Sequence, residues 1–381
     1  MVAAYGLVGL RPAPQYAARV AAPPYDVIKP GSPLERLLAA EPLSLYHVVL
    51  GPDPKGALDR LVAAGGLVRD DEPAFYVYEQ RWNGGERVGV LFAGEVTPYE
   101  ARQIVRHEKT FDDKVEGRIR LKLAIGHHIG PVFLLARTPL LPALREAMHG
   151  EPLYAFRTDL GGLNDLHGID NRVWRVPETS AAGRAIQRAL AAGPLYIADG
   201  HHRYHAALRA NFARFVGYAT EQARPTAYNR VVRGTVPFRE ARRDLALEPT
   251  DAFRTPPKHA FCVYAEGRAW MLRARHVPDD PVGRLDCSIL ERELYPALGL
   301  RHEMIKDPRH FDYYPEAALD EMRAVVDAGR YDLAIALHPV SLDELFAVAD
   351  AGLDDPNVVM PEKSTFFSPK ILSGLFLQRV R

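Results

Sequence analysis

Hydrophobic and polar positions form short runs along the chain, and these runs predict strands interspersed with helices. The segments 74–81 and 87–93 flank Asn83-Gly84-Gly85, a turn sequence typical of a β-hairpin. The segments 261–264 and 269–273 predict a second hairpin. Further apolar runs predict strands at 45–50, 130–135, 195–197, 229–236, 333–337 and 375–380.

Other segments carry apolar residues at helical spacing. The predicted helices are 57–67, 181–190, 286–297, 317–328 and 342–351, with others starting at 34 and 204. This mixture of helices, strands and hairpins indicates an α+β fold with mixed or antiparallel sheets, rather than one doubly wound parallel sheet. The composition changes after Thr250, so we expect a main α+β lobe at 1–250 and a C-terminal α+β lobe at 251–381.

The composition is that of an ordinary globular protein, with 47% hydrophobic and 25% charged residues. The 48 basic and 48 acidic residues cancel, so we expect no nucleic-acid partner. No apolar stretch approaches the length of a membrane span, and no membrane partner is expected. Cys262 and Cys287 have no metal-type spacing, which favours a reducing, cytoplasmic location. The sequence leaves homo-oligomerisation open.

The most informative segment is Asp199-Gly200-His201-His202-Arg203, which lies between a predicted strand and a predicted helix. A strand, a tight turn and a helix direct free backbone N–H groups and the positive end of a helix dipole at one place. Glycine permits the strained turn, and arginine adds donors that fit phosphate oxygens. An Asp-Gly pair before a helix is often only a turn with an N-cap. The convergence of these groups nevertheless favours a phosphate-binding turn.

A second segment, Arg106-His107-Glu108-Lys109-Thr110, is followed by further cations that include Lys114. A solvated helix face explains many such charged runs. The functional interpretation makes Glu108 a general base, or a carboxylate that faces a metal ion. The cations around it would then neutralise phosphate oxygens. His107 is either part of that chemistry or an ordinary buried residue.

Two more segments could contribute to a site. The C-terminal segment 360–375 concentrates lysines and hydroxyl groups around two prolines, which fits an anion-binding loop or a terminal strand. Its candidate ligands are Lys363, Ser364, Thr365 and Lys370. Near the N-terminus, Tyr25 and Asp26 follow a rigid Pro-Pro pair. They could form the wall of a substrate pocket or only a turn.

The histidine pairs at 127–128 and 201–202 raise the question of a metal site. The spacing typical of catalytic zinc, two histidines four residues apart with a glutamate between them, is absent from the sequence. We therefore expect no dedicated transition-metal site. Mg²⁺ that arrives with a nucleotide is more compatible with the oxygen ligands on offer.

The chain resembles the uncharacterised family called domain of unknown function 1015. Six motifs carry the resemblance, in order along nearly the whole chain. They are 22–28 (Ala-Pro-Pro-Tyr-Asp-Val-Ile), 42–48 (Pro-Leu-Ser-Leu-Tyr-His-Val), 106–110, 130–135 (Gly-Pro-Val-Phe-Leu-Leu), 197–204 (Ile-Ala-Asp-Gly-His-His-Arg-Tyr) and 360–370. Members of this family usually carry a Pro-Thr-His-Arg-like segment shortly after a Tyr-Asn pair. Here Tyr228-Asn229 continues to Phe238 without it, which puts catalytic activity in question.

A second resemblance concerns Asp199-Gly-His-His-Arg203 alone. It is similar to the phosphate-contacting turn of the ParB and sulfiredoxin-like group, which includes nucleotide-dependent free-serine kinases. The resemblance implies a ParB/sulfiredoxin-like phosphate-binding lobe that binds a nucleotide, ATP or ADP, at this turn. It also implies a glutamate as catalytic base, for which Glu108 is our hypothesis, with His107 and His202 as further candidate catalytic residues.

Taken together, the sequence predicts a phosphotransferase that uses a nucleotide donor and a small-molecule acceptor, such as free serine or a similar hydroxy metabolite. Asp199 to Arg203, Arg106, Lys114 and the C-terminal lysines and hydroxyl groups would bind phosphate. Two alternatives share the same pocket: a nucleotide-binding switch that hydrolyses slowly or not at all, and a phosphatase of a phosphorylated amino acid.

Overall fold

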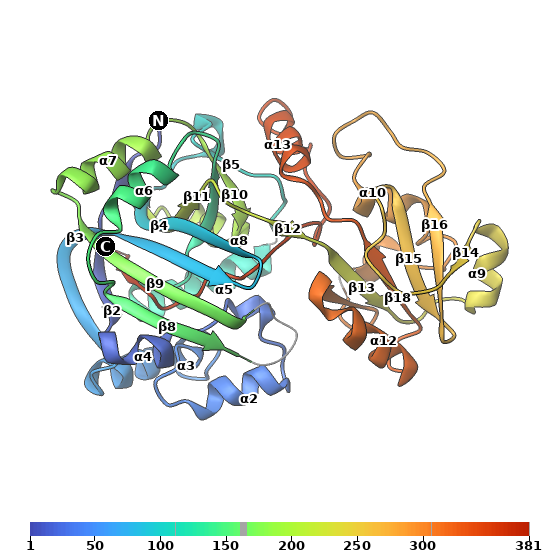
Figure 1. Cartoon of the computed structure of the whole chain (residues 1–381), viewed down its shortest axis with the longest axis horizontal. Helices are drawn as coiled ribbons and strands as arrows, with labels where there is room; N and C mark the ends of the chain where they lie inside the picture. Colours follow the sequence, from blue (N-terminus) through green and yellow to red (C-terminus); the bar gives the residue numbers. More distant parts are fainter. Residues whose placement is uncertain (111, 161–165, 306, 381) are drawn as a thin grey trace.

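The computed structural model describes residues 1–110, 112–160, 166–305 and 307–380. Figure 1 shows a large lobe and a small lobe, joined by segments that include β12 (Pro225–Thr226). The large lobe is built on a twelve-stranded sheet. Its main path runs β5 (Ile104–Val105), β10 (Leu195–Asp199), β7 (Val132–Ala136), β11 (Arg214–Thr220), β4 (Gly85–Glu95), β3 (Leu67–Trp82), β2 (Leu7–Pro12), β20 (Leu377–Arg379) and β6 (His127–His128).

This sheet is mixed, which confirms the predicted α+β class. Strand β10 pairs in parallel with β5 and antiparallel with β7, whereas β11 pairs in parallel with β7 and antiparallel with β4. Strands β3 and β4 form the predicted hairpin, with Trp82 opposite Gly85. Off the main path, β1 (Ala4–Tyr5) pairs with β4, and β9 (His167–Pro177) pairs with both β3 and β8 (Tyr154–Asp159).

Alternate residues of the central strands enter two hydrophobic cores, as the two-residue period of a strand requires. Tyr76 and Tyr78 of β3 pack in one core, and Phe75 and Val77 pack in the other. The second core is covered by α6 (Leu141–Ala147), α7 (Ala181–Leu190) and α8 (His201–Arg209). The first core is completed by α13 (Leu342–Ala351) and by apolar residues of the C-terminal segment.

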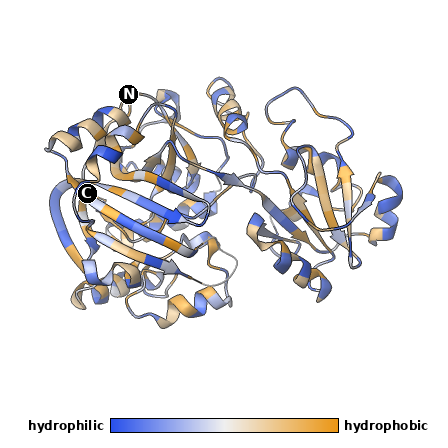
Figure 2. Cartoon of the chain, in the orientation of Figure 1, coloured by the Kyte–Doolittle hydropathy of each residue, from blue (hydrophilic) through white to orange (hydrophobic). Residues whose placement is uncertain are grey.

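The small lobe has an antiparallel six-stranded sheet. Its order is β14 (Glu248–Thr250), β16 (Arg268–Arg273), β15 (Ala260–Ala265), β18 (Leu333–Leu337), β13 (Tyr228–Val232) and β17 (Phe311–Pro315). Helix α12 (Leu319–Asp327) packs in one of its cores, and α9 (Phe238–Asp244) and α10 (Asp286–Glu293) pack in the other. In Figure 2 hydrophobic residues concentrate on the strands of this lobe, whereas α9 at its outer edge is mostly hydrophilic.

The change between the two sheets does not coincide with the expected boundary at residue 250. Strand β13 already belongs to the small sheet, although the sequence placed it in the main lobe. After the small lobe the chain returns to the large lobe, where β20 pairs with β2 and β6 in the large sheet. Strand β19 (Phe366–Phe367) pairs with β12 where the chain passes between the lobes. An apolar run shows that a strand exists but not which sheet it joins, so sequence pattern alone misplaced both segments.

One predicted strand is wrong. The segment 45–50 forms the short helix α3 (Tyr46–Val49), in which Val48 is fully buried. A short apolar run is compatible with a buried strand or a buried helix turn, and periodicity cannot distinguish them. Further helices of the N-terminal third are α1 (Ala17–Val20), α2 (Pro33–Ala40), α4 (Pro54–Ala63) and α5 (Asp112–Ile125). Among the helices of the described residues, none is long and apolar enough to cross a membrane.

Candidate functional site

The predicted phosphate-binding turn has the expected strand–turn–helix geometry. Strand β10 ends at Asp199, and α8 begins at His201. Gly200 between them has φ of +100°, a left-handed conformation that residues with a side chain rarely adopt. A Cβ atom at this position would also lie 2.8 Å from Nε of Arg203. The backbone conformation therefore requires glycine, and a Cβ atom would displace the guanidinium of Arg203. The first N–H groups of α8 lie beside this residue.

Asp199 organises the cations of the turn. Nη2 of Arg203 donates a 3.0 Å hydrogen bond to Oδ1 of Asp199, and Nζ of Lys370 donates a 2.9 Å hydrogen bond to Oδ2. Burial alone would raise the pKa of the Asp199 carboxyl, but Lys370 and Arg203 hold it well below its usual range. An ionised carboxylate repels phosphate. Asp199, which the sequence placed among the phosphate-binding residues, lines the cavity and holds two cations there.

The turn lines a cavity of about 140 Å³ that brings the separate motifs together. The lining residues are mostly polar or charged and come from five segments of the chain. They are Tyr25, Asp26, Glu108, Lys114, residues 198–203, Tyr228, Glu362, Lys363, Thr365, Phe367 and Lys370.

Backbone hydrogen bonds tie these segments to one another. The N–H of Met360 donates to the carbonyl of His107 at 2.7 Å, which fixes the C-terminal segment beside Glu108. Ala22 and Ser373 exchange a pair of backbone hydrogen bonds of 3.1 and 2.8 Å, so the N-terminal segment is anchored to the same part of the chain. These isolated bridges bring the segments of Asp26, Glu108 and Lys370 close together, although they are distant in sequence.

Glu108 faces this cavity from a partly buried position. Burial raises the pKa of its carboxyl to about 7, an effect that Lys363 and Lys114 partly oppose. Carboxyl groups whose pKa lies near neutrality can accept and release protons at the working pH. The environment of Glu108 is therefore suited to proton transfer.

His107 and His201 form a buried pair behind the turn. Their rings are perpendicular, with centroids 4.5 Å apart, and the backbone N–H of His107 donates to Nε2 of His201 at 3.4 Å. Burial lowers the pKa of His107 to about 4 and that of His201 well below its usual value, so both rings are neutral near pH 7. Among the described residues, neither ring nitrogen of His107 has a hydrogen-bond partner.

The ligand atoms of His107, Glu108 and His201 lie within 4.8 Å of one another, a spacing that a metal ion could use. The sequence did not indicate this cluster, because His107 and His201 are 94 positions apart. The absence of a dedicated transition-metal site remains a prediction.

Several predicted residues lie next to the cavity without lining it. The guanidinium of Arg106 lies 4.8 Å from the centre of the Tyr99 ring, and His107 is enclosed behind the turn. The hydroxyl of Ser364 donates to the carbonyl of Pro361. His202 does line the cavity, and burial lowers its pKa to about 4.

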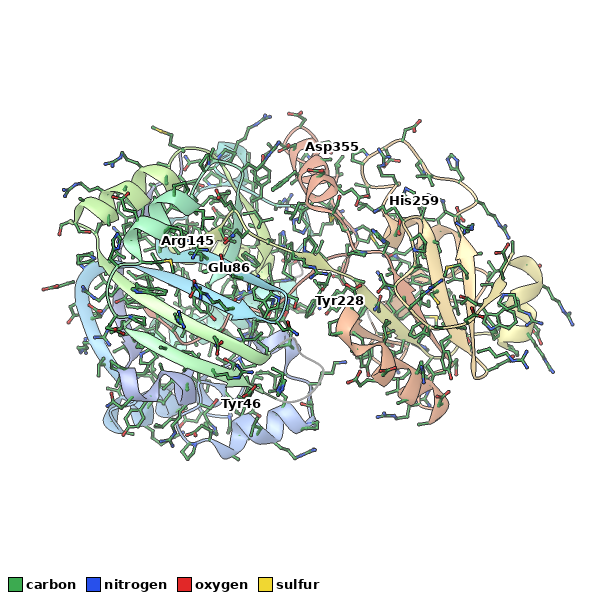
Figure 3. The ribbon with its side chains drawn as sticks, in the orientation of Figure 1. Tyr46, Glu86, Arg145, Tyr228, His259 and Asp355 are labelled. Atoms are coloured by element: carbon green, nitrogen blue, oxygen red, sulfur yellow. The ribbon has the colours of Figure 1, made fainter. Side chains whose placement is uncertain are left out.

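Three lining side chains with polar or aromatic groups were missed by the sequence analysis: Tyr228, Glu362 and Phe367. Glu362 and Phe367 lie inside the C-terminal motif, where attention went to lysines and hydroxyl groups. Tyr228 lies between the two lobes (Figure 3). Its position next to Asn229 in the family's Tyr-Asn pair was the only signal that could have identified it.

The chain is similar to several solved structures at low sequence identity. A mutant of a free serine kinase in complex with AMP is 12% identical, with a TM-score of 0.40, over 74% of this chain and 88% of that one. A conserved hypothetical protein from Pyrococcus furiosus is 14% identical, with a TM-score of 0.39, over 75% and 95%. SbnI with C-terminal truncation, from Staphylococcus aureus, is 12% identical, with a TM-score of 0.38, over 74% and 85%. These likenesses assign no activity to the chain.

No curated protein matches the sequence. A family model does match, and it covers residues 6–288, which include the N-terminal, Glu108 and Gly200 segments of the cavity. The chain therefore belongs to the family described as protein of unknown function (DUF1015).

Proposed function

We propose that the protein transfers a phosphoryl group from a nucleotide to a small hydroxy metabolite, of which free serine is the simplest example. The observation that carries this proposal is the meeting of the Gly200 turn, Lys363, Lys370 and Glu108 at one small cavity. Phosphoryl transfer requires positioning and neutralisation of charge more than covalent chemistry, together with a group that accepts the proton of the acceptor.

The donor phosphates would occupy the N-terminal end of α8. The backbone N–H groups of its first turn would donate to phosphate oxygens, as at other helix N-termini. Arg203 and Lys370, which Asp199 orients, would neutralise charge from one side. Lys363 and Lys114 line the cavity as well and would add positive charge.

The residues present also fit a nucleotide-bound Mg²⁺. The carboxylates of Asp26 and Glu362 line the cavity and offer the oxygen ligands that Mg²⁺ prefers. Among the described residues, Oε1 of Glu362 is buried without a hydrogen-bond partner, so this acceptor is free to bind a cation. When bound, the ion would supply further neutralisation of the phosphate charge.

Glu108 would act as the general base. It would accept the proton of the acceptor hydroxyl while that oxygen attacks the terminal phosphorus. The bond from phosphorus to the bridging oxygen breaks, and the nucleotide leaves with the negative charge and one phosphate fewer. The products are a phosphate monoester and the shortened nucleotide.

A single-turnover assay with γ-labelled ATP and β-labelled ADP, with and without serine, tests this function. We expect labelled phosphoserine to form only with serine present and to be lost in Glu108→Gln, which should still bind nucleotide. Nucleotide binding without transfer to any hydroxy acceptor would instead indicate a binding switch. Release of phosphate from phosphoserine without nucleotide would indicate a phosphatase.

A further inference from the structure

A second cavity of about 620 Å³ adjoins the phosphate-binding cavity. Asp26, Tyr228 and Lys363 line both, so the two spaces meet at these residues. One wall of the larger cavity is the N-terminal segment 26–34 of the large lobe. The opposite wall comes from β13, β17 and α12 of the small lobe, so the cavity lies at the junction of the lobes. Figure 1 shows β13 and α12 on the side of the small lobe that is nearer the large lobe.

Aromatic rings form the part of this cavity that lies next to the phosphate-binding site. The ring centre of Tyr228 is 5.4 Å from that of Tyr313 and 5.2 Å from that of Phe366, and all three residues line the cavity. Aliphatic groups of Ile28 and Val325 add apolar surface. Aromatic faces of this kind stack on planar ligands, including nucleobases of any sequence.

The two cavities differ in volume, which indicates that they bind different parts of the ligands. The smaller one, at about 140 Å³, is suited to phosphate groups and a compact acceptor. The larger one, at about 620 Å³, falls in the range of ~300–1,000 Å³ that is usual for sites of larger organic ligands. A molecule of the size of serine would leave most of the larger cavity unfilled.

An ion pair holds the two walls together. Nζ of Lys29, in the N-terminal segment, lies 2.7 Å from Oδ2 of Asp312 in β17. The same ammonium lies 4.0 Å from the centre of the Tyr314 ring. Asp312 is thus already paired, whereas Glu321 and Arg330 add further charged groups to the lining of the cavity.

We propose that the larger cavity binds the nucleoside of the phosphate donor, with its base on the Tyr228–Tyr313–Phe366 wall and its phosphates reaching the Gly200 turn past Lys363. This inference rests on the proposed function, because it takes the donor to be a nucleotide. It adds that the small lobe contributes directly to nucleotide binding, through residues of β13, β17 and α12.

Ala324 offers a direct test, because it lies on α12, is exposed and lines the larger cavity. An Ala324→Trp substitution would place an indole in the proposed nucleoside subsite without disturbing either core. The matched control is Ala328→Trp, an exposed alanine at the end of the same helix that lies outside the cavity. Affinities for ATP, ADP and inorganic pyrophosphate are measured by calorimetry on the full chain.

The expected result is at least a tenfold loss of nucleotide affinity in Ala324→Trp, with unchanged pyrophosphate affinity and wild-type behaviour of Ala328→Trp. Wild-type nucleotide affinity in Ala324→Trp would overturn the inference and leave the proposed function standing. Failure of the unmodified chain to bind either nucleotide or pyrophosphate would overturn the proposed function itself. If circular dichroism shows that Ala324→Trp folds poorly, Tyr313→Leu replaces it. This variant is also expected to lose nucleotide affinity and to keep its pyrophosphate affinity.

Discussion

Nζ of Lys370 donates a 2.9 Å hydrogen bond to Oδ2 of Asp199, although the two residues are 171 positions apart. The same carboxylate accepts from Arg203 through its other oxygen, so one partly buried acid fixes two cations beside the Gly200 turn. This arrangement links the C-terminal segment to the turn and sets the charge that an incoming phosphate would meet.

Lys370→Met should therefore weaken nucleotide binding by at least tenfold, which corresponds to about 1.4 kcal/mol. The reason is the loss of a desolvated positive charge at the phosphate position. Equilibrium dialysis with labelled ATP measures the effect. Lys109→Met is the control, because Lys109 belongs to the Glu108 motif but is exposed and outside the cavity. Equal affinities of the two variants would contradict the role of Lys370.

The Asp199→Asn variant tests whether Asp199 orients Arg203 and Lys370 or only repels phosphate. If Asp199 only repelled phosphate, removal of its charge would tighten nucleotide binding. Because it holds Arg203 and Lys370 in place, we expect binding to weaken instead, with a steeper dependence on salt as the two cations become mobile. Calorimetry at two salt concentrations measures both quantities, and tighter binding would refute the positioning role.

Gly200→Ala should lower the free energy of unfolding by about 1–3 kcal/mol, because the residue has φ of +100°. It should also disturb Arg203, whose Nε would lie 2.8 Å from the new Cβ. Gly267→Ala is the matched control. Gly267 has a positive φ of +71° in the β15–β16 turn, but its Cβ would meet no atom within 4 Å. Urea denaturation should show a loss of stability in both variants, whereas nucleotide affinity should fall only in Gly200→Ala.

Four carboxylates line the cavity, at Asp26, Glu108, Asp199 and Glu362, and the amide variants of the first two should show which of them is the base. Glu108→Gln should abolish phosphoryl transfer while nucleotide binding stays near normal, because the base is lost and the size is kept. Asp26→Asn should weaken binding of Mg²⁺-nucleotide and retain a measurable single-turnover rate at saturation. The opposite pattern would transfer the role of base from Glu108 to Asp26.

Asp70 should make stability depend on pH in acid. Burial alone would raise its pKa, but hydrogen bonds from Arg175, Tyr76 and Arg11 lower it to about 2 from an ordinary value of 3.8. The unfolded chain therefore binds a proton before the folded one does, so stability is present above about pH 4 and is lost as the pH falls towards 2. Urea denaturation between pH 2 and 5 gives the free energy of unfolding at each pH. This free energy should depend less steeply on pH in Asp70→Asn than in the unmodified chain, and an equal dependence in both would contradict the role of Asp70.

Local chemistry made the Gly200 turn predictable from sequence. A strand, a glycine and a helix start within a few residues encode that geometry without reference to the rest of the chain. The hairpin of β3 and β4 and the bounds of α7 and α13 were predictable for the same reason. The contact of His107 with His201, the pairing of β20 with β2 and the place of Tyr228 depend on tertiary packing, which no pattern within a short window encodes. The prediction of a strand at 45–50 was wrong because a buried helix turn and a buried strand carry the same apolar residues.

The return of the chain to the large lobe has a consequence for its synthesis. Strand β20 and both C-terminal lysines of the cavity follow the small lobe in the sequence, so the ribosome makes them after that lobe. Until then β2 lacks its β20 neighbour and stays an open edge, which is prone to non-native pairing. A chain that is cut short before residue 363 would lack both lysines and the closing strand. The proposed ligand site should thus form in one step after the small lobe has been made, rather than in proportion to the length already made.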